Sequence, residues 1–237
     1  MFARITTAAL IGIDAIRIEL EVDYSRAGMP AFTLVGLAEG AVKESKERVF
    51  SALKNSGYKL PPARITINLA PADVRKEGSS YDLPLALGLL AASGAIPPEN
   101  VQNIFMSGEL SLTGELKAIN GALPLALKAR NDQARAVMVP GVNAQEAAVV
   151  QGIPVYGMDS LGQAVRFLSG EIDQEPVRFD IDTLWQRGAE FQVDFSEVKG
   201  QDNAKRAIEI ASAGCLLYTS DAADDLLCVD LGGRRII

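Results

Sequence analysis

The feature that most constrains this chain is the alternation of strand-like and helix-like segments along its first 170 residues. The strand segments have period-two patterns or short β-branched runs, whereas the helix segments place apolar side chains on one face. This alternation predicts one mixed α/β layer domain over residues 1–170. The predicted strands are 2–10, 13–23, 31–37, 64–71, 104–110, 111–117, 134–140 and 153–158, and the predicted helices are 39–56, 81–93, 120–132, 143–150 and 160–170.

Composition narrows the class of protein. The chain is 48% hydrophobic and 22% charged, which is typical of a globular protein and excludes disorder and coiled coil. No run approaches the ~18 apolar residues of a membrane helix, so no membrane segment is expected. The net charge of -7 argues against a surface built mainly for nucleic acid. The absence of His removes the commonest general base and metal ligand, so we expect no metal site.

The C-terminal part changes character twice. Residues 171–193 are acidic and lack periodicity, which predicts a linker that packs through Phe179, Leu184 and Trp185. Residues 194–214 predict a new module with a helix from about Gln201 to Ala213. Residues 215–237 resemble translated sequencing-adaptor DNA and contain both cysteines, so we expect a non-native tail without thiol chemistry. The cysteine-free remainder fits a cytoplasmic protein.

The segment richest in reactive side chains is the loop Lys76-Glu77-Gly78-Ser79-Ser80-Tyr81-Asp82, which opens a predicted helix. Its hydroxyls and amides could hold an anion or present a nucleophile. Alternatively, Ser79 or Ser80 caps the helix and Asp82 complements its dipole. Two neighbouring groups of charges have simpler interpretations. These are a small basic patch of Arg64, Arg75 and Lys76, and a solvated helix face formed by Lys43, Glu44, Lys46, Glu47 and Arg48.

Residues 65–170 resemble the proteolytic domain of Lon-type proteases and the Lon-like domain of the recombination protein RadA. The resemblance implies a ribosomal-S5-domain-2-like α/β fold, and it places Ser80 at the position of the nucleophile. It also places Leu123 where the family has its Lys base, and leucine cannot take a proton from a hydroxyl. Neither Lys117 nor Lys128 is expected to point at Ser80, so we expect the catalytic dyad to be lost. The motifs are the 76–82 loop, Ser107-Gly108-Glu109 with Gly114 and Glu115, and Ile119-Asn120-Gly121-Ala122-Leu123.

A second resemblance, to the YifB/ComM group of magnesium-chelatase-like AAA+ ATPases, covers residues 1–214. It implies that the parent protein hydrolyses ATP with Mg²⁺ as a homo-hexamer. It also implies DNA remodelling, by branch migration in recombination and natural transformation. The N-terminal domain would be a non-catalytic scaffold or partner-binding element. The segments that carry the resemblance are 6–23, 30–58, 64–94 and 194–214.

The same resemblance places Val198-Lys199-Gly200-Gln201 on the adenine side of a nucleotide site, although a turn before a helix explains these residues equally well. A phosphate-binding loop needs G-x-x-x-x-G-K-[ST], and no such string occurs in the sequence. We therefore expect a module truncated before that loop, no bound cofactor in this fragment, and weak binding to DNA. Two alternatives stay open: a Lon-like serine hydrolase that uses Ser80, and a magnesium-chelatase motor subunit. The Lon-like domain argues against the second.

Overall fold

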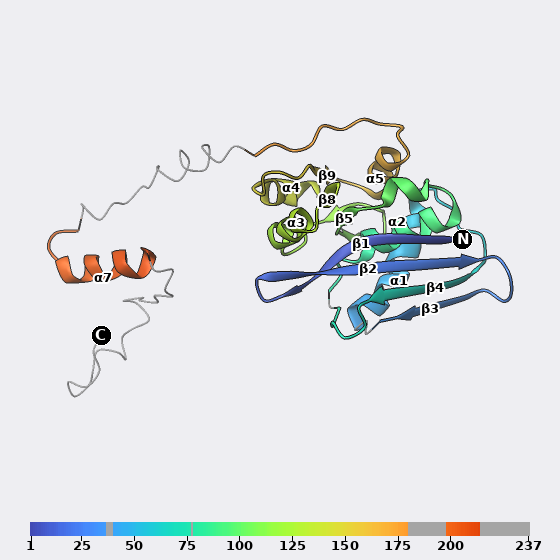
Figure 1. Ribbon diagram of the computed structural model, residues 1–237, viewed down its shortest axis with the longest axis horizontal. Helices are drawn as coiled ribbons and strands as arrows, with labels where there is room; N and C mark the ends of the chain where they lie inside the picture. Colours follow the sequence, from blue (N-terminus) through green and yellow to red (C-terminus); the bar gives the residue numbers. More distant parts are fainter. Residues whose placement is uncertain (37–39, 77, 180–197, 214–237) are drawn as a thin grey trace. The chain divides into compact units, whose positions relative to one another are not determined.

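The computed structural model describes residues 1–36, 40–76, 78–179 and 198–213. It divides into two compact units, Met1–Ile181 and Asp182–Ile237. The first unit is a layered α/β domain, in agreement with the fold class predicted from the sequence (Figure 1).

A seven-stranded mixed sheet forms the centre of the first unit. Its order is β3-β4-β2-β1-β5-β8-β9. β2 runs antiparallel to both of its neighbours, β1 and β4, and the other adjacent pairs are parallel. β6 and β7 form a separate antiparallel ribbon. The strands are β1 Phe2–Ile11, β2 Asp14–Ser25, β3 Ala31–Val35, β4 Arg64–Ala70, β5 Ile104–Met106, β6 Glu109–Leu110, β7 Leu116–Lys117, β8 Ala136–Pro140 and β9 Val155–Met158.

Helices pack on the two faces of this sheet and enclose two cores. α1 (Gly40–Asn55), α2 (Asp82–Ser93) and α5 (Leu161–Leu168) contribute to the main core, whereas α3 (Ala122–Asn131) and α4 (Gly141–Ala148) contribute to a second core. Alternate residues of a strand point to opposite faces, and β1 accordingly sends Ala3, Ile5 and Ala9 into the main core and Ala8 into the second core. A short 3₁₀ helix, Pro98–Val101, connects α2 to β5.

α2 is the most enclosed helix of the domain. Eleven consecutive residues, Asp82–Ala92, are buried, which explains why the segment shows no amphipathic pattern. The helix ends at Gly94, whose φ of 89° is the left-handed conformation that favours glycine at this position. The first turn of α2 is therefore enclosed by the core.

The sequence prediction is wrong in two neighbouring stretches. Residues 111–117 were expected to form a strand, but only Leu116–Lys117 does so, as β7. Residues 104–110 were expected to form one strand, but β5 ends at Met106 and β6 begins at Glu109 in the separate ribbon. The break follows from the backbone of Gly108, whose N–H donates to the Ser80 carbonyl and whose carbonyl accepts from the Leu83 N–H, both at 2.9 Å. The chain leaves the sheet because it is hydrogen-bonded to the start of α2.

The second unit contains one described helix, α7 (Asp202–Ala213), which agrees with the helix expected from about Gln201 to Ala213. The predicted positions of Leu184 and Trp185 in the linker, and the predicted tail 215–237, lie outside the described residues. The part of the linker that is described, 171–179, packs as expected through Phe179, together with Val177, against the second core.

Candidate functional site

A pocket of about 750 Å³ opens at the loop that the sequence singles out. Four segments surround it: the end of β1, the loop that precedes α2, the turn between β5 and β6, and the loop that precedes α3. Ser79, Ser80 and Tyr81 therefore share one pocket with Glu109 and with the apolar end of β1. The lining residues are Ala8–Ile11, Asp73–Arg75, Gly78–Tyr81, Ser107, Glu109, Ala118–Gly121 and Leu125.

The two serines do not cap α2, in contrast to one expectation from the sequence. The residue at the N-cap is Tyr81, and its side chain makes no capping hydrogen bond. Ser79 instead donates its hydroxyl hydrogen bond to the Glu109 carboxylate. The Ser80 carbonyl accepts hydrogen bonds from the Gly108 N–H at 2.9 Å and from the Ser107 hydroxyl at 3.3 Å. These contacts hold the Ser80 backbone and leave its half-buried side chain beside the pocket.

Asp82 has a larger role than the expected complement of the helix dipole. Its carboxylate is fully buried and accepts hydrogen bonds from Arg48 Nε at 2.8 Å and Arg48 Nη2 at 3.1 Å. It also accepts from the Leu110 backbone N–H at 3.2 Å. The hydrogen-bonded carboxylate raises the pKa of Arg48. Arg48 was expected on a solvated face of α1, and it instead joins α1, α2 and β6.

Leu123 occupies the position of the Lon-type base and supplies no basic group. It lies on the first turn of α3, 36% exposed, and is not among the residues that line the pocket. Its backbone N–H donates to the Glu146 carboxylate at 3.0 Å. The two nearest lysines in sequence are engaged elsewhere: Lys117 pairs with Glu115 at 3.3 Å, and Lys128 pairs with Asp132 at 2.8 Å.

Lys76 contradicts the expected basic patch. Its side chain is fully buried, and its ammonium donates to the Gly36 carbonyl at 2.8 Å and to the Pro71 carbonyl. Burial lowers the pKa of Lys76, and the carboxylate of Asp73 opposes this shift. Arg64 is exposed and Arg75 lines the pocket, so these residues and Lys76 form no common surface. Lys76 instead ties the loop before α2 to the ends of β3 and β4.

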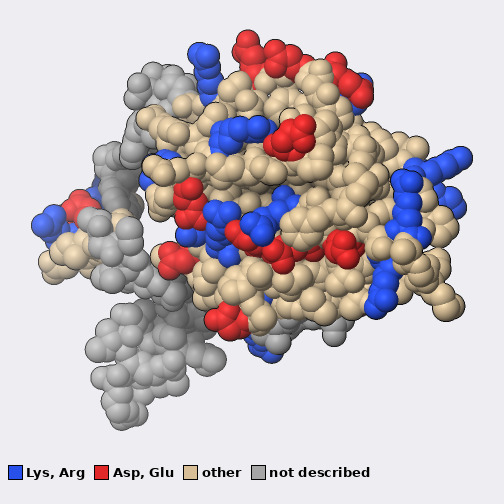
Figure 2. All heavy atoms as spheres, turned by 45° about the vertical axis from the view of Figure 1, so that its right-hand side comes forward, with Lys and Arg blue, Asp and Glu red and all other residues tan. Residues whose placement is uncertain are grey.

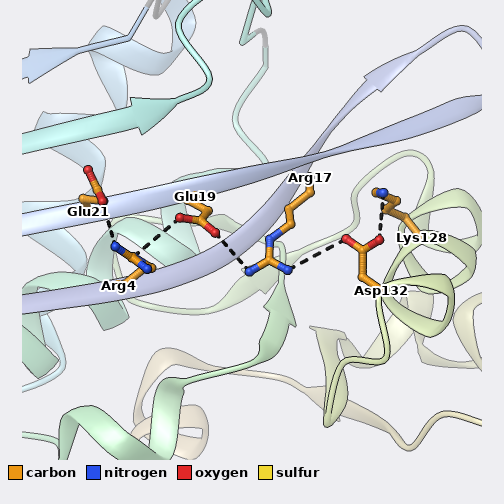
Figure 3. A network of polar contacts seen from close by, with 6 residues as sticks. All are labelled: Arg4, Arg17, Glu19, Glu21, Lys128 and Asp132. Atoms are coloured by element: carbon orange, nitrogen blue, oxygen red, sulfur yellow. Dashed lines mark hydrogen bonds and ion pairs between the residues drawn. The ribbon is translucent and has the colours of Figure 1, made fainter.

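A network of six charged residues crosses β1, β2 and α3 on the face of the sheet that carries the second core (Figure 3). Arg4 contacts Glu21 at 3.2 Å and Glu19 at 3.5 Å, and Arg17 contacts Glu19 at 3.1 Å and Asp132 at 4.0 Å. Across the middle of Figure 2, basic and acidic side chains likewise lie next to one another. Because carboxylates partner these cations, the network offers little net positive charge to a polyanion.

The segment Val198–Gln201 forms a turn directly before α7. Gly200 and Gln201 have φ values of 71° and 60°, and the Lys205 ammonium donates to the Val198 carbonyl at 2.5 Å. This geometry fits the simpler of the two interpretations, a turn before a helix. The adenine-side role stays a prediction.

No group of three or more acidic or cysteine side chains in the part of the chain that the structure describes could hold a metal ion. Among the same residues, no helix is long and apolar enough to cross a membrane.

Known proteins resemble the chain in two ways. A family model described as subunit ChlI of Mg-chelatase matches residues 20–143. Competence protein ComM of Haemophilus influenzae is 39% identical over 216 residues, which are 90% of this chain and 42% of ComM. YifB of Escherichia coli is 40% identical over 208 residues, which are 88% of this chain and 40% of YifB. The chain thus spans about two fifths of the length of these relatives.

The second resemblance is weaker and is confined to part of the chain. Lon protease 2 of Bacillus subtilis is 29% identical over 143 residues, which are 59% of this chain and 25% of that protease. This match agrees with the Lon-like fold expected from the motifs around Ser80 and Leu123.

Proposed function

This chain belongs to the family of the ChlI subunit of magnesium chelatase, and we propose that its first unit is a non-catalytic domain of an AAA+ ATPase of the ComM and YifB type. In this proposal the Lon-like domain is a scaffold that binds a partner. The rest of the whole protein supplies ATP hydrolysis.

One observation carries the non-catalytic part of the proposal: among the described residues that line the Ser80 pocket, there is no lysine or histidine to act as the base. A serine hydroxyl needs an adjacent amine, imidazole or similar group to take its proton. The chain has no His, and Leu123 stands where the Lon-type lysine would be. Among the described residues, Lys76 is buried against two carbonyls, and Lys117 and Lys128 are paired with carboxylates.

The activity of the whole protein is proposed from the resemblance to ComM and YifB. We propose that the whole protein binds ATP and Mg²⁺, assembles as a homo-hexamer and moves branched DNA during natural transformation. The name of the relative ComM, a competence protein, supports the last step. We propose that this chain does not bind ATP tightly by itself, because the phosphate-binding motif G-x-x-x-x-G-K-[ST] does not occur in its sequence. No step of hydrolysis is therefore assigned to its residues.

A chimera tests this proposal. Residues 1–179 of this chain replace the matching residues of ComM in Haemophilus influenzae, and the frequency of natural transformation is measured. We expect the chimera to restore transformation to a strain that lacks ComM. A second chimera that carries Ser80→Ala should perform equally well, because the proposal assigns no chemistry to this hydroxyl. A folded, expressed chimera that leaves transformation at the level of the deletion strain would contradict the proposal.

A serine hydrolase is the second candidate, and the similarity to Lon protease 2 together with the retained pocket at Ser80 favours it. The Ser80→Ala chimera separates the two candidates, since a hydrolase would lose its activity with this substitution. The name of the family model suggests a third candidate function, that of the motor subunit of magnesium chelatase. A chimera that functions in transformation would oppose it.

A further inference from the structure

β1 extends beyond the strand that lies beside it. β1 runs from Phe2 to Ile11, whereas β5 has 3 residues and pairs with β1 at Thr6↔Phe105. Past Thr6, the side of β1 that faces away from β2 has no strand partner within the described ranges of the chain. We call residues Ala8–Ile11 the free edge of β1, and all four of them line the pocket at Ser80.

The pairing with β2 determines which backbone groups the free edge presents. Met1 and Tyr24 exchange two backbone hydrogen bonds, from the Met1 amino group at 2.6 Å and from the Tyr24 N–H at 2.8 Å. Hydrogen-bonded and non-hydrogen-bonded pairs alternate along an antiparallel ladder. Residues 7, 9 and 11 of β1 therefore bond to β2, whereas Ala8 and Leu10 turn their N–H and C=O groups away from it. Thr6 has the same parity as Ala8, and it is the residue that pairs with β5.

The outward backbone groups of the free edge favour an extended peptide over a polyanion as the ligand. Ala8 and Leu10 present their groups two residues apart, at a repeat of about 6.8 Å, which an extended peptide reproduces along its own backbone. Val74, Ile119 and Leu125 add apolar surface to the pocket, and its volume of about 750 Å³ is within the usual range for ligand sites. The carboxylates of Asp73 and Glu109 lie in the same lining and disfavour a polyanion.

We propose that the free edge of β1 binds an extended peptide segment of a partner protein as an added strand, with an apolar side chain of the peptide in the pocket beside Ser80. Main-chain hydrogen bonds would give affinity, and the pocket would select alternate side chains. This inference deepens the proposed function and rests on it, because it identifies the kind of partner that a non-catalytic domain would hold.

The first test uses overlapping synthetic peptides that together cover bovine β-casein, an unfolded protein, and measures their binding to the full chain by fluorescence anisotropy. We expect a subset of apolar peptides to bind. Methylating single backbone nitrogens of the best peptide should weaken binding at every second position, because an added strand bonds through alternate residues. The absence of binding at about 1 mM peptide, or a loss that does not alternate, would overturn the proposal.

The second test changes the free edge itself. Leu10→Pro removes an N–H that points away from β2, so the β1–β2 ladder keeps its hydrogen bonds. Leu10→Ala is the matched control, because it removes the same side chain and keeps the N–H. We expect Leu10→Pro to bind the best peptide about tenfold more weakly than Leu10→Ala does, with both variants folded by circular dichroism. Equal affinities would overturn the proposal.

Dimerisation of the chain and cleavage of the bound peptide are two further outcomes that would change the interpretation. If the chain dimerises in sedimentation and Leu10→Pro abolishes the dimer, the free edge binds a second copy and the proposal of a partner peptide is wrong. If a peptide binds with the alternating pattern and is also cleaved, strand addition is supported while the non-catalytic function is refuted.

Discussion

At the scale of single residues, Ser80 occupies the position of the Lon-type nucleophile, but Leu123 replaces the lysine that would accept its proton. We predict that a serine-directed fluorophosphonate probe does not label the chain at neutral pH, as measured by intact-protein mass spectrometry. Ser80→Ala should change the free energy of unfolding by less than about 0.5 kcal/mol, because Ser80 does not cap α2. Labelling of the unaltered chain that disappears in Ser80→Ala would show that another base exists.

The variant Leu123→Lys tests the lost base directly. Leu123 lies partly exposed on α3 and outside the pocket lining, so a lysine there would keep its ammonium in water. An ordinary lysine pKa of about 10.4 leaves the amine protonated at neutral pH and unable to accept a proton. We therefore expect no labelling of Leu123→Lys by the same probe. Labelling in this variant would show that α3 still directs position 123 at Ser80.

Lys76 makes the stability of the domain depend on pH. Burial lowers its pKa in the folded state below the unfolded value of about 10.4. Between these two pKa values the unfolded chain binds a proton that the folded chain does not, so the contribution of Lys76 to stability rises with pH. We predict that the unfolding free energy of the natural chain, relative to that of Lys76→Met, rises as the pH approaches about 10.4 in urea titrations. The exposed variant Lys59→Met controls for the loss of a charge, and a difference independent of pH would contradict the prediction.

At the scale of elements, the Arg48–Asp82 pair joins α1, α2 and β6. Removing one partner of a buried pair leaves the other uncompensated, at a cost of about 3–5 kcal/mol. We predict a loss of this size for Arg48→Met in urea denaturation, because this variant leaves the fully buried Asp82 carboxylate without its guanidinium partner. Asp82→Ala should cost less, because the guanidinium that it leaves behind is partly exposed to water. Lys117→Met is the control, because the exposed Lys117–Glu115 pair contributes about 0–1 kcal/mol. Equal effects of Arg48→Met and Lys117→Met would contradict the assigned role of Asp82.

The elements of the first unit show which parts of the fold can be predicted from the sequence and which cannot. Local periodicity predicted most of the strands and helices of the first unit. The strand expected at 111–117 is reduced to Leu116–Lys117, and the strand expected at 104–110 is broken. That strand breaks because the Gly108 backbone bonds to Ser80 and Leu83, a contact across 25 residues or more that no local pattern encodes. The motif around Ser80 could be recognised because its residues are adjacent in sequence. The burial of Lys76 and the free edge of β1 could not be predicted, because both depend on segments that are distant in sequence. The free edge in particular depends on where β5 ends.

At the scale of the whole molecule, the remaining question is where the first domain ends. The sequence places the boundary at residue 170, but residues beyond it contact the domain. Gln174 Nε2 donates to the Gly157 carbonyl at 2.7 Å, the Val177 N–H donates to the Val155 carbonyl at 2.8 Å, and Val177 and Phe179 pack against the second core.

We predict that a chain of residues 1–179 unfolds with the same free energy as the full chain, within about 0.5 kcal/mol. A chain of residues 1–170 should lose about 1–3 kcal/mol, because it exposes apolar surface of the second core. Equal stability of the two shortened chains in urea denaturation would place the boundary at residue 170, and a large loss in the 1–179 chain would show that residues 180–237 belong to the folded domain.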